Sequence, residues 1–356
     1  MQEKEELYWY WLCNLSGIGN KRIKRLLDVF KSPKAVFYAA PEALHGCTGL
    51  TQQNIETIMK NRNMEKVYKS FTQLQHKGIS FIYKEGKQYP QNLLQLYDMP
   101  YGLYSKGQLL RADEPAVAMV GARGCSGYGR SVAYSFAKAF AQLGITVVSG
   151  MASGIDTAAH EGCIAGGGRT VAVLGNGVDI CYPRENIRLY MQIQEKGTIL
   201  SEYPPGTPVR PWMFAPRNRI ISGLAHGTLI VQAREKSGAM LTVDHAQEQG
   251  RCVFAVPGDI TQGASYWPNK LIQQGAAVVL ETADILDEFG WQHAASGERG
   301  AKQTLDLESY SPEEKLILLA LGRGPLTHDT LCALTKLSRQ SVMAHLTTLE
   351  MEGIIE

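Results

Sequence analysis

Short apolar runs recur through the middle of the chain, separated by stretches with helical spacing. In order, they are AVAMVG, ITVVSG, TVAVLG, GTILSE, GTLIVQA, CVFAVPG and AAVVLE. Continuous apolar runs of this kind are typical of parallel strands that are buried on both faces of a sheet, with helices in the crossover connections. The pattern therefore predicts an α/β domain over residues 115–290, with a doubly wound, mainly parallel sheet extended by extra strands.

The segments on either side have a different pattern. Residues 1–75 carry apolar positions at helical spacing and are predicted to form a helical domain. Residues 76–114 are interpreted as a short mixed connector, rich in Tyr and turn residues. The polar, aperiodic residues 291–311 are interpreted as a linker. Residues 312–356 show three short helical patterns, and their closing GIIE could begin a β-wing.

The charge of the chain is unevenly distributed, although its net value is only +2. Residues 1–114 carry 16 basic and 11 acidic residues, and residues 115–280 carry 14 and 10. Residues 281–356 carry 6 basic and 13 acidic residues. The first two segments are therefore suited to a polyanionic partner, whereas the acidic last segment is not.

The cysteines and the N-terminus indicate the compartment. No C-x-x-C pair occurs among the seven cysteines, which are Cys13, Cys47, Cys125, Cys163, Cys181, Cys252 and Cys332. This argues against a zinc site or a disulfide framework and fits a reducing cytosol. The opening MQEKEELYWYWL is acidic, unlike a signal peptide, and no apolar stretch is long enough to span a membrane. We expect a cytoplasmic protein with no bound metal or cofactor and no membrane partner.

Four predicted strands run into a glycine, namely Gly121, Gly150, Gly175 and Gly258. The carboxyl ends of parallel strands share one edge of the sheet, where open α/β folds bind ligands. Backbone N–H groups in such turns bind anions, and a glycine leaves room for a phosphate to approach. Each glycine could instead serve only a tight turn, but four of them on one edge favour a binding crevice.

The loop GARGCSGYG at the first of these ends carries Arg123, whose guanidinium can bind a phosphate through two hydrogen bonds. It lacks the G-x-G-x-x-G spacing of dinucleotide folds, and the chain contains no G-K-[ST] P-loop. The next loop, SGMASGID, offers Ser149, Ser153 and the N–H groups around Gly154. The sequence therefore predicts a phosphate pocket without a nucleotide cofactor.

A further stretch, RPWMFAPRNRIISG, carries Arg210, Arg217 and Arg219 around Phe214. Interleaved basic and aromatic residues suit single-stranded nucleic acid, because the cations hold phosphates and an aromatic face stacks a base, at about 1–3 kcal/mol per base. Alternatively, Phe214 fills the core and an arginine pairs with Asp or Glu. For Arg219 the two interpretations carry equal weight.

Five stretches, in this order, resemble the DprA/Smf family (DNA-processing protein A). They are VGARGCSGYG, SGMASGIDTAAHEGCIAGGGRTVAVLGNGVDICYP, LSEYPPG, FAPRNRIISGL and AREKSGAMLTVDHA. The resemblance is dense over about residues 115–280 and looser in the flanks. One departure is Gln232, where members of the family often have Glu.

The resemblance implies an extended Rossmann fold that binds and protects incoming single-stranded DNA, forms a homodimer, and loads RecA recombinase during natural transformation. It implies no established enzymatic activity. By its motifs, it places the DNA pocket at Gly121, Arg123, Ser149, Gly150, Gly154, Tyr182, Asn186, Phe214, Arg217, Asn218 and Ser237. With Ser153 and Arg210 from the two loops, these form the predicted site.

A catalytic interpretation would choose Asp156, His160 and Glu202. Asp156 and His160 lie four residues apart at the start of a predicted helix, where a carboxylate also suits the helix dipole. No G-x-S-x-G elbow, metal-ligand cluster or Walker lysine accompanies them. The rival function is a Rossmann-like phosphoribohydrolase of the lysine-decarboxylase-like group. Its PGGxGTxxE motif is absent, since the comparable stretch here is AREKSGAMLT.

The two flanking domains contain possible DNA contacts. LSGIGNKRIKRLL fits a helix-hairpin-helix, in which Gly17, Gly19, Lys21 and Arg22 would bind a DNA phosphate. LHGCTGLTQQNIETI is a weaker second copy. Such hairpins also merely join helices, so DNA contact and a structural role are both open. The C-terminal helices resemble a winged helix-turn-helix, but residues 312–356 hold four basic and six acidic residues. Because phosphate contacts supply most non-specific duplex affinity, we expect protein contacts or regulation there.

Overall fold

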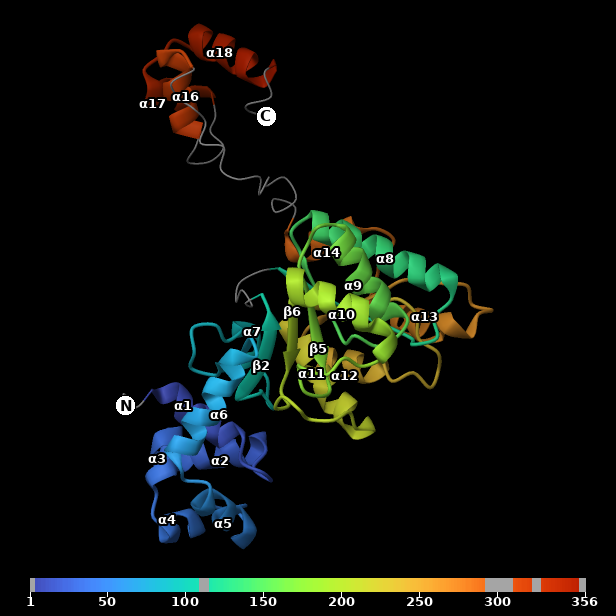
Figure 1. The fold of residues 1–356 in the computed structure, drawn as a ribbon. Coiled ribbons are helices and arrows are strands. Elements are labelled where there is room, and N and C mark those ends of the chain that lie inside the picture. Colours follow the sequence, from blue (N-terminus) through green and yellow to red (C-terminus); the bar gives the residue numbers. More distant parts are fainter. Residues whose placement is uncertain (1–3, 109–114, 292–309, 322–327, 352–356) are drawn as a thin grey trace. The chain divides into compact units, whose positions relative to one another are not determined.

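The chain forms two compact units, Met1–Ser296 and Gly297–Glu356, which are described separately (Figure 1). The computed structural model describes residues 4–108, 115–291, 310–321 and 328–351. Within these ranges, no helix combines the length and the apolar character that crossing a membrane requires.

One nine-stranded sheet organises the first unit, in the order β1-β2-β6-β5-β4-β3-β7-β8-β9. All the pairs from β6 to β9 are parallel, whereas β1–β2 and β2–β6 are antiparallel. The seven predicted apolar runs all form strands, which confirms the doubly wound α/β class. Their bounds are β3 (Ala116–Val120), β4 (Thr146–Ser149), β5 (Thr170–Leu174), β6 (Thr198–Ser201), β7 (Gly227–Ile230), β8 (Cys252–Ala255) and β9 (Ala277–Val278).

Helices cover both faces of this sheet, as the continuous apolar strands require. On β3, Val117 and Met119 pack against α8 and α9, whereas Ala118 and Val120 pack towards α11. The helices of this α/β region are α8 (Gly127–Gln142), α9 (Ile155–Ala165), α10 (Ile187–Lys196), α11 (Phe214–Leu224), α12 (Met240–Glu248), α13 (Tyr266–Gln273) and α14 (Thr282–Phe289). Short 3-10 turns precede three of them, at Arg184–Asn186, Pro211–Met213 and Gly263–Ser265.

The segment 76–114, interpreted above as a connector, contributes to the same sheet. Its strands β1 (Ile79–Tyr83) and β2 (Gly102–Gly107) form a hairpin around the short helix α7 (Gln91–Leu94), and β2 pairs with β6. The run ISFIY signals β1, but Gly102–Gly107 (GLYSKG) has no strand-like alternation. Its partner β6 lies more than 90 residues further along the chain, so the pairing has no local signal in the sequence.

The N-terminal residues fold as helices, as their spacing predicts. These are α1 (Glu5–Cys13), α2 (Asn20–Phe30), α3 (Pro33–Tyr38), α4 (Pro41–His45), α5 (Gln52–Lys60) and α6 (Met64–His76). Their core is aromatic. Trp9 is fully buried and stacks on Tyr83 and Tyr101 at centroid distances of 6.1 Å. This core also includes side chains of α10, such as Leu189 and Ile193, so it is continuous with the α/β region.

The second unit contains α16 (Pro312–Leu321), α17 (His328–Thr335) and α18 (Arg339–Met351). Ile317, Leu318 and Leu349 form its own small apolar core. The predicted β-wing at GIIE lies outside the described residues, and so does most of the predicted linker.

Candidate functional site

A cavity of about 850 Å³ opens where β3 and β7 end, beside the first turn of α11. The parallel register of β3 with β4 and β7 brings these carboxyl ends to one edge, as predicted. Seven of the predicted residues line the cavity: Gly121, Arg123, Tyr182, Phe214, Arg217, Asn218 and Ser237.

Three side chains of the cavity lining lie around the Phe214 ring. Two guanidinium carbons approach its centroid, Arg123 at 5.6 Å and Arg217 at 5.9 Å. The Tyr182 ring lies 5.6 Å from it, at an interplanar angle of 30°. Arg123 and Tyr182 are exposed. One wall therefore presents an exposed cation and an exposed aromatic ring, each beside Phe214. These are the two groups that hold phosphates and stack bases.

Arg217 has a different role from Arg123, because only 5% of it is exposed. Its Nη1 donates to the carbonyl of Gly150 at 2.7 Å and to that of Val173, and its Nε donates to Asn218 Oδ1 at 3.1 Å. Burial, opposed by Asp156 and reinforced by Arg123, lowers the pKa of Arg217 to about 10. Arg217 thus remains charged at neutral pH, ties the ends of β4 and β5 together, and contributes positive potential to the cavity that it lines.

The remaining residues of the predicted site do not line the cavity. Ser149 Oγ donates to the Met119 carbonyl at 2.6 Å, and Ser153 Oγ donates to Glu185 at 2.6 Å. Asn186 Nδ2 donates to the Met151 carbonyl at 3.1 Å and to Thr157 Oγ1 at 2.9 Å. These hydrogen bonds fasten the loop after β4. Arg210 is exposed at the start of the Pro211–Met213 turn, outside the lining.

Two glycines of this loop allow close packing within the protein. A Cβ on Gly150 would lie 2.6 Å from Arg217 Nη1. A Cβ on Gly154 would lie 2.3 Å from the carbonyl oxygen of Ala122 and 2.4 Å from that of Arg123. Gly154 also has a φ of +86°, which side chains rarely adopt. The absence of a Cβ at Gly154 therefore lets the second loop pack against the loop that carries Arg123.

Two further cations of the lining, Arg234 and Lys236, were not among the predicted residues. Both are exposed and follow β7, which lies beside β3 in the sheet. The stretch AREK after an apolar run carried this signal. Only the strand order, however, shows that it reaches the same edge as Arg123.

Gln232 links the loops after β3 and β7. Its Oε1 accepts from the backbone N–H of Ser126 at 2.9 Å, and its Nε2 lies 2.9 Å from Ser126 Oγ. Ser126 in turn caps α8 by accepting from the Gly129 N–H at 3.2 Å. An amide can both donate and accept here, so the Gln found in this chain satisfies both sides of Ser126.

The residues of the catalytic interpretation are engaged in packing. Asp156 is buried and accepts from the N–H groups of Gly150 at 3.2 Å and Ala152 at 3.3 Å. Burial raises its pKa to about 6, although Arg217 and these N–H groups lower it. His160 is fully buried with Nδ1 2.6 Å from Thr170 Oγ1, and burial lowers its pKa to about 3. Across the described ranges, no three His, Cys, Asp or Glu side chains gather as metal ligands.

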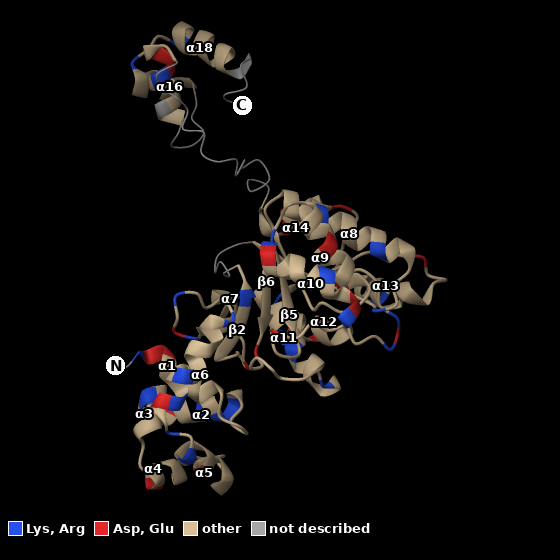
Figure 2. Cartoon of the chain, viewed as in Figure 1, with Lys and Arg blue, Asp and Glu red and all other residues tan. Residues whose placement is uncertain are grey.

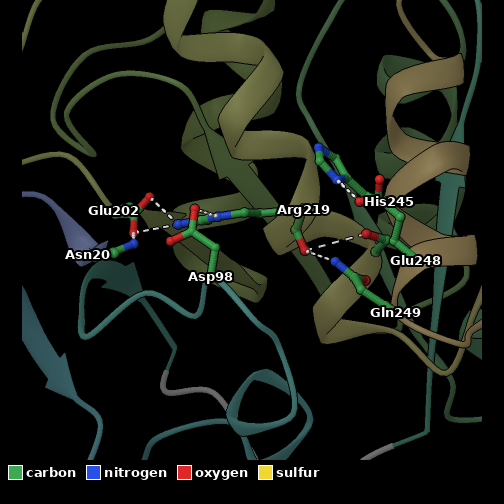
Figure 3. Close-up of polar contacts among 8 residues, drawn as sticks. Asn20, Asp98, Glu202, Arg219, His245, Glu248 and Gln249 are labelled. Atoms are coloured by element: carbon green, nitrogen blue, oxygen red, sulfur yellow. Dashed lines mark hydrogen bonds and ion pairs between the residues drawn. The ribbon is translucent and has the colours of Figure 1, made fainter. Parts of the chain in front are cut away.

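Of the two interpretations of Arg219, the structure supports the ion pair. Its Nη2 donates to both carboxylate oxygens of Glu202, at 2.8 and 2.9 Å, and its Nε lies 3.4 Å from Asp98 Oδ2 (Figure 3). Glu202 also accepts from Asn20 Nδ2 at 2.7 Å, so α2 joins the network. Arg219 lies on the side of α11 away from the Phe214 cavity, whose lining does not include it.

The predicted hairpin is formed by α1, α2 and their connecting turn. Arg22 Nη1 donates to the Gly17 carbonyl at 3.0 Å, and Asn54 Nδ2 donates to the same oxygen at 3.3 Å. Arg22 and Gly17 thus help to join the first hairpin to α5. Gly19 and Lys21 are exposed at the start of α2, where no side chain caps the helix.

The sheet and its cavity define an extended Rossmann-like protein with a cationic, aromatic-lined cavity at the carboxyl edge. Family models then specify the kind. Residues 80–290 match the DNA recombination-mediator protein A family, and residues 301–356 match the DprA winged helix domain. The chain belongs to the DprA/Smf family of DNA recombination-mediator proteins, as its motifs predicted.

Individual relatives agree with this assignment. Protein Smf of Synechocystis sp. is 32% identical over 100% of this chain and 97% of its own. The X-ray structure of DNA processing protein A from Streptococcus pneumoniae gives a TM-score of 0.68 at 32% identity, covering 81% of this chain and 99% of that one. A structure of DNA processing protein A from Helicobacter pylori gives a TM-score of 0.54 at 26% identity, covering 60% of this chain and 96% of that one. That structure concerns the single-stranded DNA binding mode of the Helicobacter pylori protein.

Proposed function

We propose that this protein binds single-stranded DNA in the Phe214 cavity without acting on it chemically. The observation that carries the proposal is the wall on which Arg123 and Tyr182 flank Phe214. Exposed cations bind the backbone, whereas rings stack bases of any sequence. The relative from Helicobacter pylori, which binds single-stranded DNA, supports the same assignment.

The exposure of each side chain in and around the cavity indicates its role in binding. Arg123, Arg234 and Lys236 are exposed and would bind phosphates directly. Arg217 is buried and would act through its charge. Ser149, Gly150, Ser153, Gly154 and Asn186 would support the wall from behind, and Asn218 and Ser237 would supply polar groups on the lining. Such a site follows the backbone, so we expect it to select strand type over base sequence.

Membership of a DNA recombination-mediator family supports a wider proposal for the intact protein. It would protect incoming single strands during natural transformation and load RecA recombinase on them. It would act as a homodimer, because two linked cavities gain avidity without any new contact. Large apolar side chains exposed around the last strand, Val278 and Leu280, are consistent with self-association.

The test of the binding site is a titration of labelled oligothymidylate by fluorescence anisotropy. Arg123→Ala should weaken binding about tenfold, or about 1.4 kcal/mol, and lower the salt dependence by about one phosphate contact. The matched control is Arg130→Ala, because Arg130 is exposed, pairs with Glu161 at 2.8 Å and lies outside the cavity lining. Equal affinities for the Arg123 variant and the unmodified protein would refute the site.

The phosphoribohydrolase alternative is tested separately. Incubation with nucleoside monophosphates should release no free base, because Glu202, Asp156 and His160 are committed to internal contacts. Release of base that Arg123→Ala abolishes would favour the enzyme.

A further inference from the structure

Two hollows lie between α2 and the α/β region, on the other side of α11 from the Phe214 cavity. One, of about 240 Å³, is lined by α2 and by Tyr97–Met99. The other, of about 440 Å³, is lined by the start of α2 and by Pro216 and Arg219 of α11. Asn20, Lys21, Arg25 and Asp98 line both, so the two hollows adjoin.

The α2 side of these hollows is cationic. Lys21, Lys24 and Arg25 are exposed, and no carboxylate among the described residues pairs with them. Figure 2 shows Lys and Arg along this helix. The first turn of α2 carries neither an acidic residue nor a side-chain cap, so its N–H groups add to the positive potential.

An exposed aromatic ring stands beside these cations. Tyr97 is 88% exposed, and Lys24 Nζ lies 5.5 Å from its ring centroid. A ring so accessible gains little from packing within the protein. Cation and ring together repeat the chemistry of Arg123 and Phe214.

The buried Arg219 lines the adjoining hollow. It is 7% exposed, and its Nη1 has no partner among the described residues. Its other nitrogens hold Glu202 and Asp98, and Glu202 holds Asn20 of α2 (Figure 3). Two of the three carboxylates that line the hollows are thereby paired, and only Asp28 remains against the cations of α2.

We propose that these hollows are a second contact for the same single strand. The first turn of α11 borders both sites, since Phe214 and Ala215 line the cavity and Pro216 lines the adjoining hollow. A strand leaving the cavity would cross this turn, bring phosphates to Lys21, Lys24 and Arg25, and stack a base on Tyr97. The proposal rests on the proposed function and extends its path from the cavity to α2.

The experiment compares oligothymidylates of about 5 and about 25 nucleotides, the first short enough for one site and the second long enough for both. The double variant with Lys21→Ala and Lys24→Ala should bind the short oligonucleotide with unchanged affinity. It should weaken the long one about tenfold and lower its salt slope by about 1.4, or about 0.7 for each phosphate that is no longer neutralised. Tyr97→Ala should weaken only the long oligonucleotide, and Tyr97→Phe should restore its affinity.

The controls lie on α6 of the same helical region. Lys66 and Lys69 have the same spacing as Lys21 and Lys24, are exposed, and line neither hollow. Their double alanine variant should bind both lengths normally, and so should Tyr68→Ala. If these controls weaken binding of the long strand as much as the α2 variants do, the loss of net positive charge explains the effect. That outcome would overturn the proposal.

The two proposals fail in different ways. If Arg123→Ala weakens both lengths while the α2 and Tyr97 variants bind the long strand normally, the second contact is refuted and the cavity stands. If Arg123→Ala binds both lengths normally, the proposed function itself is refuted.

Discussion

At the scale of single residues, Gly154 shows how backbone geometry builds the cavity wall. Its positive φ and the two carbonyl oxygens near its missing Cβ leave no room for a side chain. We expect Gly154→Ala to lower the free energy of unfolding by about 3 kcal/mol, from strained dihedrals and backbone displacement together. Urea denaturation measures this loss. DNA affinity should fall too, because the displaced backbone carries Arg123.

Two other glycines separate the cost of strained dihedrals from the cost of backbone displacement. Gly167 has a φ of +77° with open space around its Cβ position, so Gly167→Ala should cost only about 1 kcal/mol. Gly124 has open space and no positive φ, so Gly124→Ala should be nearly neutral. A Gly154 variant as stable as the Gly124 variant would contradict the packing described here.

His160 gives the pH dependence of stability a definite sign. Its pKa is about 3 in the folded protein, against 6.5 for a solvated histidine, because burial disfavours the charged ring. Between these values the unfolded chain binds a proton that the folded chain does not. Stability should therefore fall as the pH drops from 6.5, by about 1.4 kcal/mol per pH unit from this group.

Asp156 opposes this effect, because its folded pKa is raised from 3.8 to about 6 and the folded state takes up its proton first. The comparison is therefore between the unmodified protein and His160→Gln, in urea denaturations from pH 6.5 to 4.5. The contribution of Asp156 is common to both and cancels in the difference. Parallel stability curves would show that His160 is not responsible.

At the scale of elements, two Arg–Glu pairs with the same 2.8 Å separation differ in what surrounds them. The Arg219 side chain of α11 is 8% exposed, whereas that of Arg130 on α8 is 51% exposed. Arg219→Ala leaves Glu202, whose side chain is 20% exposed, with only Asn20 among the described residues as a partner, and should cost about 3 kcal/mol. Arg130→Ala should cost less than about 1 kcal/mol. Thermal denaturation with matched buffers tests the contrast, and equal losses would contradict it.

The same element shows where sequence reasoning ends. The family motif around Phe214 predicted its place in one pocket with Arg123, and the two side chains do lie together in the structure. That Arg219 lies on the side of α11 away from the cavity could not be predicted. Its partners Asp98 and Glu202 are distant in the sequence, and only the helical rotation between Arg217 and Arg219 separates the two environments. The strand order that adds Arg234 and Lys236 had no local signal either.

At the scale of the whole molecule, the cavity and both hollows belong to the unit Met1–Ser296. Deleting residues 297–356 should therefore leave the affinity for single-stranded oligonucleotide within about twofold, which anisotropy would measure. A loss of tenfold or more would show that the acidic C-terminal unit takes part in binding.

The larger organisation was predicted in part. Seven parallel strands and the N-terminal helices follow from apolar spacing, which is a local property. The β1–β2 hairpin was interpreted as a connector, because an antiparallel edge depends on pairing with β6 and not on its own composition. The aromatic core shared by α1 and α10 likewise depends on contacts between distant segments.

The position of α11 between the two proposed contacts has a kinetic consequence. A strand held on both sides of this helix can leave one side while the other retains it, so release proceeds in steps. During such a step, a competing strand or a protein that coats DNA can occupy the vacated nucleotides before they rebind. The rate of release should then rise with the concentration of the competitor, whereas a strand held at one site would leave at a constant rate. A helix with a binding surface on each side would thus make transfer of the strand faster than its spontaneous dissociation.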